Sequence, residues 1–561
     1  MAFVEGDRSW YRSYPPGVPR EVDMSRYRSL VGILEESCAR FGSRPAFSCM
    51  GKMLNYADLE VQSRAFATYL LKELKLKRGD RVALMMPNLL QYPIALFGTL
   101  RAGMVVVNCN PLYTPRELSH QLKDSGAKVL VVLENMAAVA AQSLAGTEVK
   151  TVVLTAVGDR LGFPKRLLVN FVVRKVKKAV PAYTLPGAHD FNTALARNTG
   201  VALPEIEIGH EDLAFLQYTG GTTGVSKGAM LTHGNMVGNV LQAKSWIAVN
   251  AEEGTEEVIT ALPLYHIFAL TVNCLVFMSM GGCNHLIPNP RDLPGFVKEL
   301  KKLRFTGFSG VNTLYNGLLN TPGFDQVNFS HLKVSIGGGM AVQRAVAEHW
   351  KQVTGCALIE GFGLTEASPC CSMLPANAKD YNGSIGLPLP STDYSIRDDD
   401  FRPLAVGEVG ELCVRGPQVM KGYWQRPEET AKTLTPDGWL KTGDIARMDD
   451  NGYTYIVDRK KDMILVSGFN VYPNEIEDVL VTLPGVLEAA VVGEPDAKSG
   501  EAVKAVIVKK DPNLSEAQVR AHCEQHLTGY KRPKYIEFRA ELPKTNVGKI
   551  LRRELRSKPP G

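Results

Sequence analysis

The chain has 561 residues, of which 45% are hydrophobic and 22% charged, and its net charge is +6. Its 51 glycines and 33 prolines are ordinary for a globular protein, which excludes collagen-like, low-complexity and wholly disordered chains. The length predicts several folding units with large cores, and so mild a positive charge does not indicate a nucleic-acid-binding protein.

The N-terminus and the cysteines indicate the compartment. Glu5, Asp7 and Arg8 lie where a secretion signal needs an apolar core. The ten cysteines form no Cys-x-x-Cys pair, and the adjacent Cys370 and Cys371 suit neither a mutual disulfide nor one zinc ion. We therefore expect buried thiols in a reducing compartment, and a cytoplasmic protein.

The first part of the chain alternates strand and helix patterns. Residues 116–123 are expected to be helical, because Thr114 and Pro115 suit the N-cap and first turn. Short apolar runs are typical of buried parallel strands, at 81–86, 104–108 and 128–133. This alternation predicts α/β units around a parallel sheet. Two long uncharged stretches, 82–100 and 258–290, are interrupted by prolines or polar residues and are expected to be interior segments, not membrane spans.

Residues 165–180 form a basic amphipathic pattern. One helical stripe is polar or basic, and comprises Arg166, Asn170, Arg174, Lys177 and Lys178. The opposite stripe is apolar, with Leu168, Phe171, Val172, Val176 and Ala179. Two interpretations stay open: a helix that lies on an anionic membrane surface, and a surface helix packed on its own domain.

The sequence pattern changes in the last third of the chain. After about residue 383, short strands alternate with turns, as in 407–415, which predicts a small antiparallel sheet or barrel. Residues 459–561 carry 18 Lys and Arg against 14 Asp and Glu. A helix pattern at 474–480 and strand patterns at 489–492 and 502–508 predict a small, basic α+β domain.

The segment 218–228, Tyr-Thr-Gly-Gly-Thr-Thr-Gly-Val-Ser-Lys-Gly, concentrates glycines, hydroxyl groups and one lysine. Glycines permit close backbone approach and positive φ, so this combination suits a polyphosphate. It is not a Walker loop, because Lys227 follows Gly224 by three residues and precedes another glycine.

Other segments are ambiguous when taken singly. In 360–366, Phe362 between glycines suits stacking on a flat ring and Glu366 suits Mg²⁺, but a glycine-flanked aromatic is also a common packing device. Asp444 in Thr-Gly-Asp suits ribose hydroxyls or a simple turn. Lys549, near the C-terminus, has the pattern of an ordinary surface lysine.

In this order, the segments resemble the adenylate-forming superfamily of acyl-CoA synthetases, luciferases and peptide-synthetase adenylation domains. The resemblance also covers 262–268, 458–462 and 467–473. Residues 437–461 look like the fatty-acyl-CoA synthetase signature, and the chain is most similar to bacterial long-chain fatty acid–CoA ligases. The resemblance implies a large N-terminal domain, 1–458, of α/β subdomains and a small β-barrel-like part, then a hinge, 459–461, and a rotating α+β domain, 462–561.

The resemblance implies a reaction in two halves. A fatty carboxylate attacks the α-phosphate of MgATP and gives acyl-AMP and pyrophosphate, and the thiol of CoA then displaces AMP. The β- and γ-phosphates are expected at Thr219, Gly220, Gly221, Thr222, Thr223, Gly224 and Lys227. Thr365 is expected at the α-phosphate and Glu366 at Mg²⁺. Adenine is expected among Gly338, Gly339, Glu360, Gly361 and Phe362, where Phe362 replaces the family's usual tyrosine.

The remaining implied roles divide between the two halves. Asp444, supported by Arg459, is expected to hold the ribose, and His266 to line the acyl side near the carboxylate. Lys549 is expected to bridge the carboxylate and the α-phosphate. For the second half, the resemblance implies a pivot at Lys461, a segment around Gly468 that replaces Lys549, and basic residues such as Lys531 for the CoA phosphates.

Several alternatives remain open from the sequence. Within the superfamily these are a medium-chain or aryl acid–CoA ligase and a fatty acyl-AMP ligase. Outside it are a phosphotransferase or ATPase that yields ADP, and a non-catalytic lipid-binding protein that uses 165–180. The expected partners are a fatty acid, ATP and CoA, with no nucleic acid. Peripheral contact with the inner face of the cytoplasmic membrane and a homodimer are further expectations.

Overall fold

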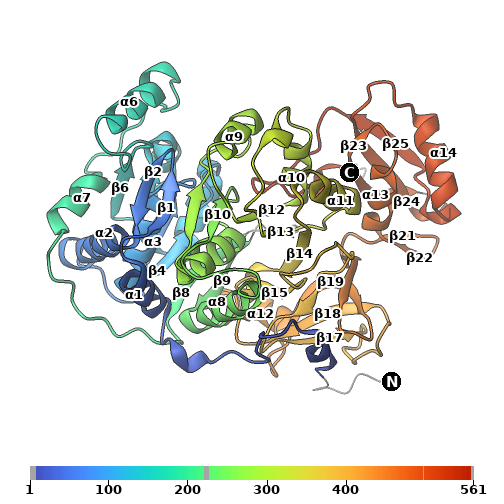
Figure 1. Ribbon diagram of the computed structural model, residues 1–561, viewed down its shortest axis with the longest axis horizontal. Coiled ribbons are helices and arrows are strands. Elements are labelled where there is room, and N and C mark those ends of the chain that lie inside the picture. The colour runs from blue at the N-terminus through green and yellow to red at the C-terminus, as the bar shows by residue number, and fades with distance from the viewer. Residues whose placement is uncertain (1–7, 220–225, 497, 557–561) are drawn as a thin grey trace.

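We describe the protein from a computed structural model, which covers residues 8–219, 226–496 and 498–556. The described residues form four sheets, which follow one another from the α/β body to the C-terminal end of the molecule (Figure 1).

The first large sheet has seven strands and is parallel except for its last pair, β8 and β9, which is antiparallel. Its order is β7 (His189–Asp190), β6 (Thr151–Thr155), β5 (Ala127–Leu133), β3 (Arg81–Met85), β4 (Val105–Asn108), β8 (Leu213–Thr219) and β9 (Lys227–Thr232). The three strands predicted at 81–86, 104–108 and 128–133 are confirmed as β3, β4 and β5.

The second large sheet has nine strands and is parallel in its centre, with antiparallel strands at both edges. Its order is β16 (Leu387–Pro388), β15 (Cys370–Met373), β14 (Leu358–Gly363), β13 (Val334–Gly338), β12 (Gly307–Gly310), β10 (Glu257–Thr260), β11 (Cys283–Leu286), β1 (Pro45–Cys49) and β2 (Lys52–Asn55). One hydrophobic core contains buried residues of both large sheets, including Val82 and Phe47, so the two sheets form one packed body.

Helices surround these sheets. Those of the first half are α1 (Leu30–Phe41), α2 (Tyr56–Thr68), α3 (Gln91–Arg101), α4 (Pro115–Ser125), α5 (Ala137–Ser143), α6 (Lys165–Phe171), α7 (Phe191–Asn198) and α8 (His233–Ile247). The second half of the α/β body adds α9 (Leu293–Leu300), α10 (Asn312–Leu319) and α11 (Arg344–Thr354).

The start and end of α4 show how local sequence sets an element. The Thr114 hydroxyl accepts from the Glu117 N–H while the Glu117 carboxylate accepts from the Thr114 N–H, which completes a capping box. Pro115 occupies the first turn, and Gly126 ends the helix in the left-handed region at φ 61°. The helix predicted at 116–123 is therefore confirmed.

The third sheet follows the change in sequence texture after residue 383. It is antiparallel, in the order β17 (Asp393–Arg397), β18 (Gly410–Arg415), β19 (Leu440–Met448) and β20 (Thr454–Arg459), with α12 (Pro427–Thr433) inserted before β19. The small antiparallel sheet predicted after residue 383 is therefore confirmed.

The fourth sheet belongs to the C-terminal end. It contains β21 (Ile464–Val466), β22 (Phe469–Val471), β23 (Val486–Asp496), β24 (Gly500–Lys509) and β25 (Tyr535–Arg539), with α13 (Pro473–Val481) and α14 (Glu516–His526). It has hydrophobic clusters of its own, one of them around Ile476 and Val491. The predicted α+β character, the helix at 474–480 and the strands at 489–492 and 502–508 are confirmed.

Two further expectations concern burial. All ten cysteines are free and buried, as predicted. Residues 258–290 form β10, a π-helical stretch (Ala269–Phe277) and β11 in the interior. Within the described residues, no helix combines the length and the apolar character that a membrane crossing requires.

The amphipathic segment begins as α6 and continues as a π-helical turn, Val172–Val176. Two residues of its polar stripe contact the protein: Asn170 is buried, and the Arg174 guanidinium pairs with Glu134 at 2.7 Å, whereas Arg166, Lys177 and Lys178 are exposed. Leu168, Phe171 and Val176 on the opposite stripe are exposed. The segment is therefore a surface helix that turns its apolar side outward, at the end of the molecule far from the C-terminal domain (Figure 1).

Candidate active site

A cavity of about 470 Å³ lies where the nine-stranded sheet, the antiparallel sheet and the C-terminal residues meet. Its walls combine segments that are far apart in the chain. They include Gly339, Glu360, Gly361, Phe362, Asp444, Arg459, Lys461 and Lys549. Eight of the predicted site residues therefore line one cavity.

Lys549 reaches this cavity on a tight turn. The Thr545 N–H donates to the Lys549 carbonyl at 2.7 Å, and the Lys549 N–H donates to the Thr545 hydroxyl at 3.0 Å. Gly548 has a φ of 87°, which favours glycine, and its carbonyl accepts from the Thr313 hydroxyl at 3.0 Å. Thr313 belongs to α10, so the α/β body holds the lysine turn in place. Sequence reasoning did not single out Thr313.

The surroundings of Lys549 destabilise its charge. Burial, and then the nearby Arg459, lower the pKa of Lys549 to about 8, while Asp444 and Glu366 act in the opposite direction. At Gly339, which has a φ of 77°, an added Cβ atom would lie 3.3 Å from Lys549 Cε. Glycine at this position leaves room for the lysine side chain.

Asp444 and Arg459 lie opposite each other on the neighbouring strands β19 and β20. Arg459 Nε is 3.2 Å from Asp444 Oδ1, and Asp444 is 4% exposed. Burial raises the pKa of Asp444, and the Arg459 charge opposes that rise. A buried carboxylate that is braced in this way suits a pair of neutral hydroxyl donors.

Glu366 follows β14 in a 3-10 turn (Thr365–Ala367). The Tyr423 hydroxyl donates to Glu366 Oε1 at 2.6 Å and fixes the carboxylate. The described residues contain no group of three His, Cys, Asp or Glu that could hold a metal. One carboxylate nevertheless fits Mg²⁺, which is commonly bound by one or two carboxylates together with substrate phosphates and water. Tyr423 was not singled out from the sequence. Its position between Gly422 and Trp424 is the one signal that the sequence offers.

Lys227, the lysine of the predicted phosphate loop, begins β9 beside Thr219 of β8. Its Nζ pairs with Glu429 at 2.8 Å and lies 4.7 Å from the Tyr423 ring centre. The phosphate-loop lysine therefore adjoins the tyrosine that holds Glu366. The predicted residues Gly220, Gly221, Thr222, Thr223 and Gly224 lie outside the described residues.

A smaller hollow of about 50 Å³ adjoins Lys549, and His266, Phe268, Phe362 and Thr365 line it. Burial, and then the Lys549 charge, lower the pKa of His266 to about 3. The imidazole is therefore neutral at physiological pH, and its Nδ1 accepts from the Phe268 N–H at 3.4 Å.

The predicted adenine residues come from two adjacent parallel strands, because Gly338 of β13 pairs with Gly361 of β14. An added Cβ atom at Gly338 would lie 3.0 Å from the Gly361 carbonyl and 3.2 Å from the Phe268 ring. Glu360 is 6% exposed, and its carboxyl oxygens accept from the Val342 N–H at 3.3 Å and the Tyr381 hydroxyl at 3.1 Å. Burial raises the pKa of Glu360 to about 8.

The two predicted CoA residues lie apart from this site. Gly468 is in the exposed turn between β21 and β22, with a φ of 86° and no atom within 4 Å of an added Cβ atom. Lys531 pairs with Glu475 at 2.7 Å. The structure thus brings Lys549, and not Gly468, to the cavity.

Comparison with known proteins gives the family. The AMP-binding enzyme model matches residues 34–424, and the AMP-binding enzyme C-terminal domain model matches 475–549. A long-chain-fatty-acid–CoA ligase of Escherichia coli O157:H7 is 58% identical, over 98% of both chains.

Two solved structures share the fold at high coverage. The anthranilate CoA ligase AuaEII in complex with anthranoyl-AMP has a TM-score of 0.83 at 26% identity and covers 95% of this chain and 98% of its own. ATP-bound MatB from Rhodopseudomonas palustris has a TM-score of 0.80 at 29% identity and covers 94% and 98%. With its cavity between the α/β body and a small C-terminal domain, the chain belongs to the AMP-binding enzyme family.

Proposed function

We propose that the protein is a long-chain fatty acid–CoA ligase, which forms acyl-AMP from ATP and a fatty acid and then transfers the acyl group to CoA. The observation that carries this proposal is the half-buried Lys549, which Asp444 and Glu366 attract, in a cavity that both domains line. The name of the 58% identical E. coli relative supports the long-chain substrate.

Lys549 acts in the first half of the reaction. A carboxylate and a phosphate, both anionic, must approach each other, so a preorganised cation at their meeting point stabilises the transition state. The cavity removes part of the hydration that stabilises the Lys549 charge. The bound carboxylate and phosphate, both anions, replace that stabilisation. Lys549 is therefore more strongly held with both substrates present than without them.

Glu366, fixed by Tyr423, is the protein ligand of Mg²⁺ in this proposal. When bound, the metal would act as a Lewis acid and stabilise the negative charge of the phosphate oxygens. Thr219, Lys227 and the residues 220–224 bind the β- and γ-phosphates, and Thr365 contacts the α-phosphate. Lys227 must leave Glu429 when the polyphosphate arrives, so Glu429 holds that cation in place before ATP binds.

The nucleoside and the acyl group have separate walls. Asp444, braced by Arg459, accepts from the ribose hydroxyls, and Phe362 stacks on adenine with Gly338, Gly339, Glu360 and Gly361 around the ring. Neutral His266 orients the carboxylate without adding a second charge beside Lys549. The apolar 258–290 region, with Phe268 at the small hollow, forms walls of the acyl tunnel.

The second half requires Lys549 to leave. We assign residues 1–458 and 462–561 to two domains that turn about 459–461, with Lys461 as the pivot. Among the described residues, the side-chain contacts between the two domains include Thr313 to Gly548, Asn316 to the Leu487 carbonyl at 3.0 Å and Arg291 to Asn546 at 3.1 Å. Asp458 also accepts from the Asn474 N–H at 2.9 Å and pairs with Arg552 at 3.7 Å. Rotation would bring Gly468 to the adenylate and Lys531 to the CoA phosphates.

We also propose that the protein is cytoplasmic and contacts an anionic membrane through 165–180. Leu168 is 64%, Phe171 59% and Val176 65% exposed, and Lys165, Lys175, Lys177 and Lys178 flank this apolar side. Apolar residues bordered by cations suit the interface of anionic lipids.

Product analysis tests the proposed reaction. The protein is incubated with ATP, Mg²⁺ and fatty acids of graded length, with and without CoA. AMP, pyrophosphate and a CoA thioester that peaks at long chains are expected. Acyl-AMP that accumulates with CoA unused would indicate an acyl-AMP ligase, a peak at short or aryl acids would move the substrate class, and ADP would overturn the proposal.

A further inference from the structure

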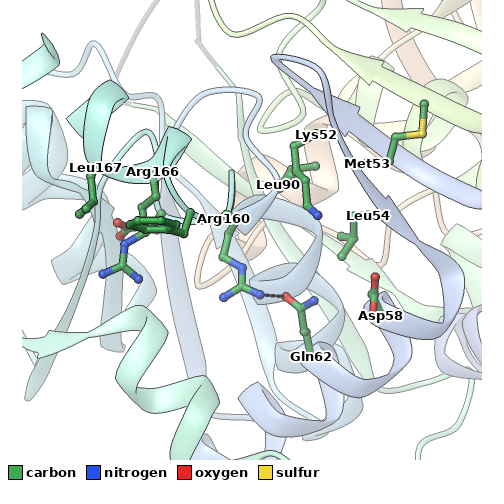
Figure 2. Close-up of a pocket in the computed structure, with 12 residues that line it drawn as sticks. Lys52, Met53, Leu54, Asp58, Gln62, Leu90, Arg160, Arg166 and Leu167 are labelled. Carbon is green, nitrogen blue, oxygen red and sulfur yellow. Dashed lines mark hydrogen bonds between the residues drawn. The ribbon is translucent and has the colours of Figure 1, made fainter. Parts of the chain in front are cut away.

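A second hollow, of about 530 Å³, lies between α6 and the edge strand β2. It shares no lining residue with the Lys549 cavity. Figure 2 shows Arg160 between Arg166 and Leu167 on one side and Leu54 and Gln62 on the other. The lining of the hollow combines charged and amide side chains with apolar ones, and nothing in the ligase reaction uses it.

Arg160 is the central cation of this hollow. Its guanidinium donates to Gln62 Oε1 at 2.6 Å and to Asn192 Oδ1 at 2.9 Å, both of them neutral amide oxygens. The ion pairs of the described residues do not include Arg160, although the residue is half-buried; burial lowers its pKa, and the charges of Asp159 and Asp58 oppose that shift. A desolvated guanidinium normally has a carboxylate or phosphate partner, and five N–H donors exceed what two amides can accept.

The nearby carboxylates do not fill that place. Asp159 already accepts from the Ala156 N–H at 2.7 Å, the Thr155 hydroxyl at 3.1 Å and the Asn170 amide at 3.0 Å. Asp58 is exposed on the first turn of α2. Lys52 and Arg166 add two further cations at the rim, and neither has an ion pair among the residues that the structure describes. The hollow therefore favours an anion.

Beside these charges, the mouth has three exposed apolar residues. Met53 is 58%, Phe163 86% and Leu167 55% exposed. The row continues along the outer side of the helix, over Leu168, Phe171 and Val176. Isolated exposed apolar residues are common, but a continuous row that starts at a cationic hollow matches a ligand with a charged head and an apolar chain.

We propose that this hollow binds the anionic head group, carboxylate or phosphate, of an acyl-chain amphiphile, with Arg160 on the head and the row from Phe163 to Phe171 along the chain. The inference does not rest on the ligase reaction. A fatty acid and an anionic phospholipid both have this chemistry, and the experiment separates these two sources.

The test measures amphiphile binding with the active site already filled. The wild-type protein is saturated with a non-hydrolysable acyl-adenylate and titrated by calorimetry with dodecyl phosphate and with dodecanoate, both below their micelle concentrations. One further equivalent is expected to bind, and Arg160→Gln to weaken it about tenfold or more, the scale of a charge-assisted hydrogen-bond pair. The tighter head group identifies the source, phospholipid or fatty acid.

Matched variants keep the result interpretable. Leu167→Asp changes an exposed residue at the mouth and is expected to weaken binding without unfolding, whereas Arg197→Gln, an exposed arginine on α7, is expected to change nothing. Melting curves check that each variant folds. The proposal is overturned if the filled wild-type protein binds neither amphiphile, if dodecyltrimethylammonium binds as tightly as they do, or if Arg160→Gln and Leu167→Asp leave binding unchanged.

Discussion

The Lys549 cavity and the Arg160 hollow both contain a half-buried cation, but they hold it differently. Lys549 lies among charges of both signs, with Asp444 and Glu366 attracting it and Arg459 and Lys461 repelling it. Arg160 donates its hydrogen bonds to neutral amides from α2 and α7 of the same α/β body, while Asp159 and Asp58 attract it and Arg166 repels it.

The attachments differ as well. Lys549 is on a turn that the Thr313 hydroxyl connects to the α/β body, and the proposed rotation would withdraw its charge with the C-terminal domain. Arg160 is fixed within the body itself. A removable cation suits a reaction that needs charge in one step only, whereas a fixed cation suits a binding site.

The largest expected effect is on Lys549. Lys549→Ala is expected to slow acyl-AMP formation by about 10²-fold or more, the scale of losing a preorganised donor to a developing anion. Thioester formation from supplied acyl-AMP is expected to persist, because that step does not use Lys549. Lys544→Ala, on the same segment but paired with Glu488, is the control. Equal loss of both half-reactions in Lys549→Ala would refute the assignment.

The pivot is the next test of a removable cation. Lys461→Pro restricts the backbone where the domains are proposed to turn, and it is expected to slow thioester formation about tenfold more than adenylation. Lys461→Ala removes the side chain and leaves the backbone free, so it is expected to keep the ratio of the two rates. Unchanged thioester kinetics in the proline variant would remove the pivot from Lys461.

Tyr423 tests whether Glu366 needs positioning. Tyr423→Phe removes the 2.6 Å hydrogen bond and is expected to raise the Mg²⁺ concentration for half-maximal adenylation about tenfold, a typical cost of losing a partner of a metal ligand. Saturating Mg²⁺ is expected to restore most of the rate. A rate loss that Mg²⁺ does not rescue would show that Tyr423 acts otherwise.

The lowered pKa of Lys549 predicts a pH profile. Burial depresses this pKa to about 8, so the ammonium form is lost as pH rises through 8, and kcat/KM for adenylation without CoA is expected to fall above that pH. Lys549→Arg keeps its charge, so whatever rate it retains is expected to lack this decline. A flat wild-type profile up to pH 9.5 would contradict the proposed role of the charge.

The smallest expected effect on catalysis is at the other end of the molecule. Leu168→Asp with Phe171→Asp places charge on the exposed side of α6. We expect reduced binding to vesicles that contain phosphatidylglycerol and unchanged activity on soluble acyl substrates. Vesicle binding equal to that of the wild-type protein would discard the membrane contact.

Much of the fold was predictable because it follows from local signals. The capping box of Thr114 and Glu117 and the apolar runs of β3 and β5 need only near neighbours. The residues of the cavity were predictable only through the resemblance, because Asp444 and Lys549 look like an ordinary turn aspartate and surface lysine in isolation.

Long-range packing accounts for what the sequence did not reveal. Tyr423 reaches Glu366 across 57 positions, and Thr313 reaches Gly548 across 235. The periodicity of 165–180 defined two stripes but not which of their residues contact the protein, because Glu134, the partner of Arg174, comes from a different element. Arg160 had no pattern at all, since its amide partners are on α2 and α7.

The most direct test of the central claim measures both half-reactions in the same two variants. Rapid-quench assays would follow acyl-AMP formation without CoA, and acyl-CoA formation from supplied acyl-AMP, in Lys549→Ala and Lys461→Pro. A cation that serves one step and then leaves predicts opposite defects, with adenylation lost in the first variant and thioester formation in the second. Parallel defects in both half-reactions, in both variants, would contradict the account.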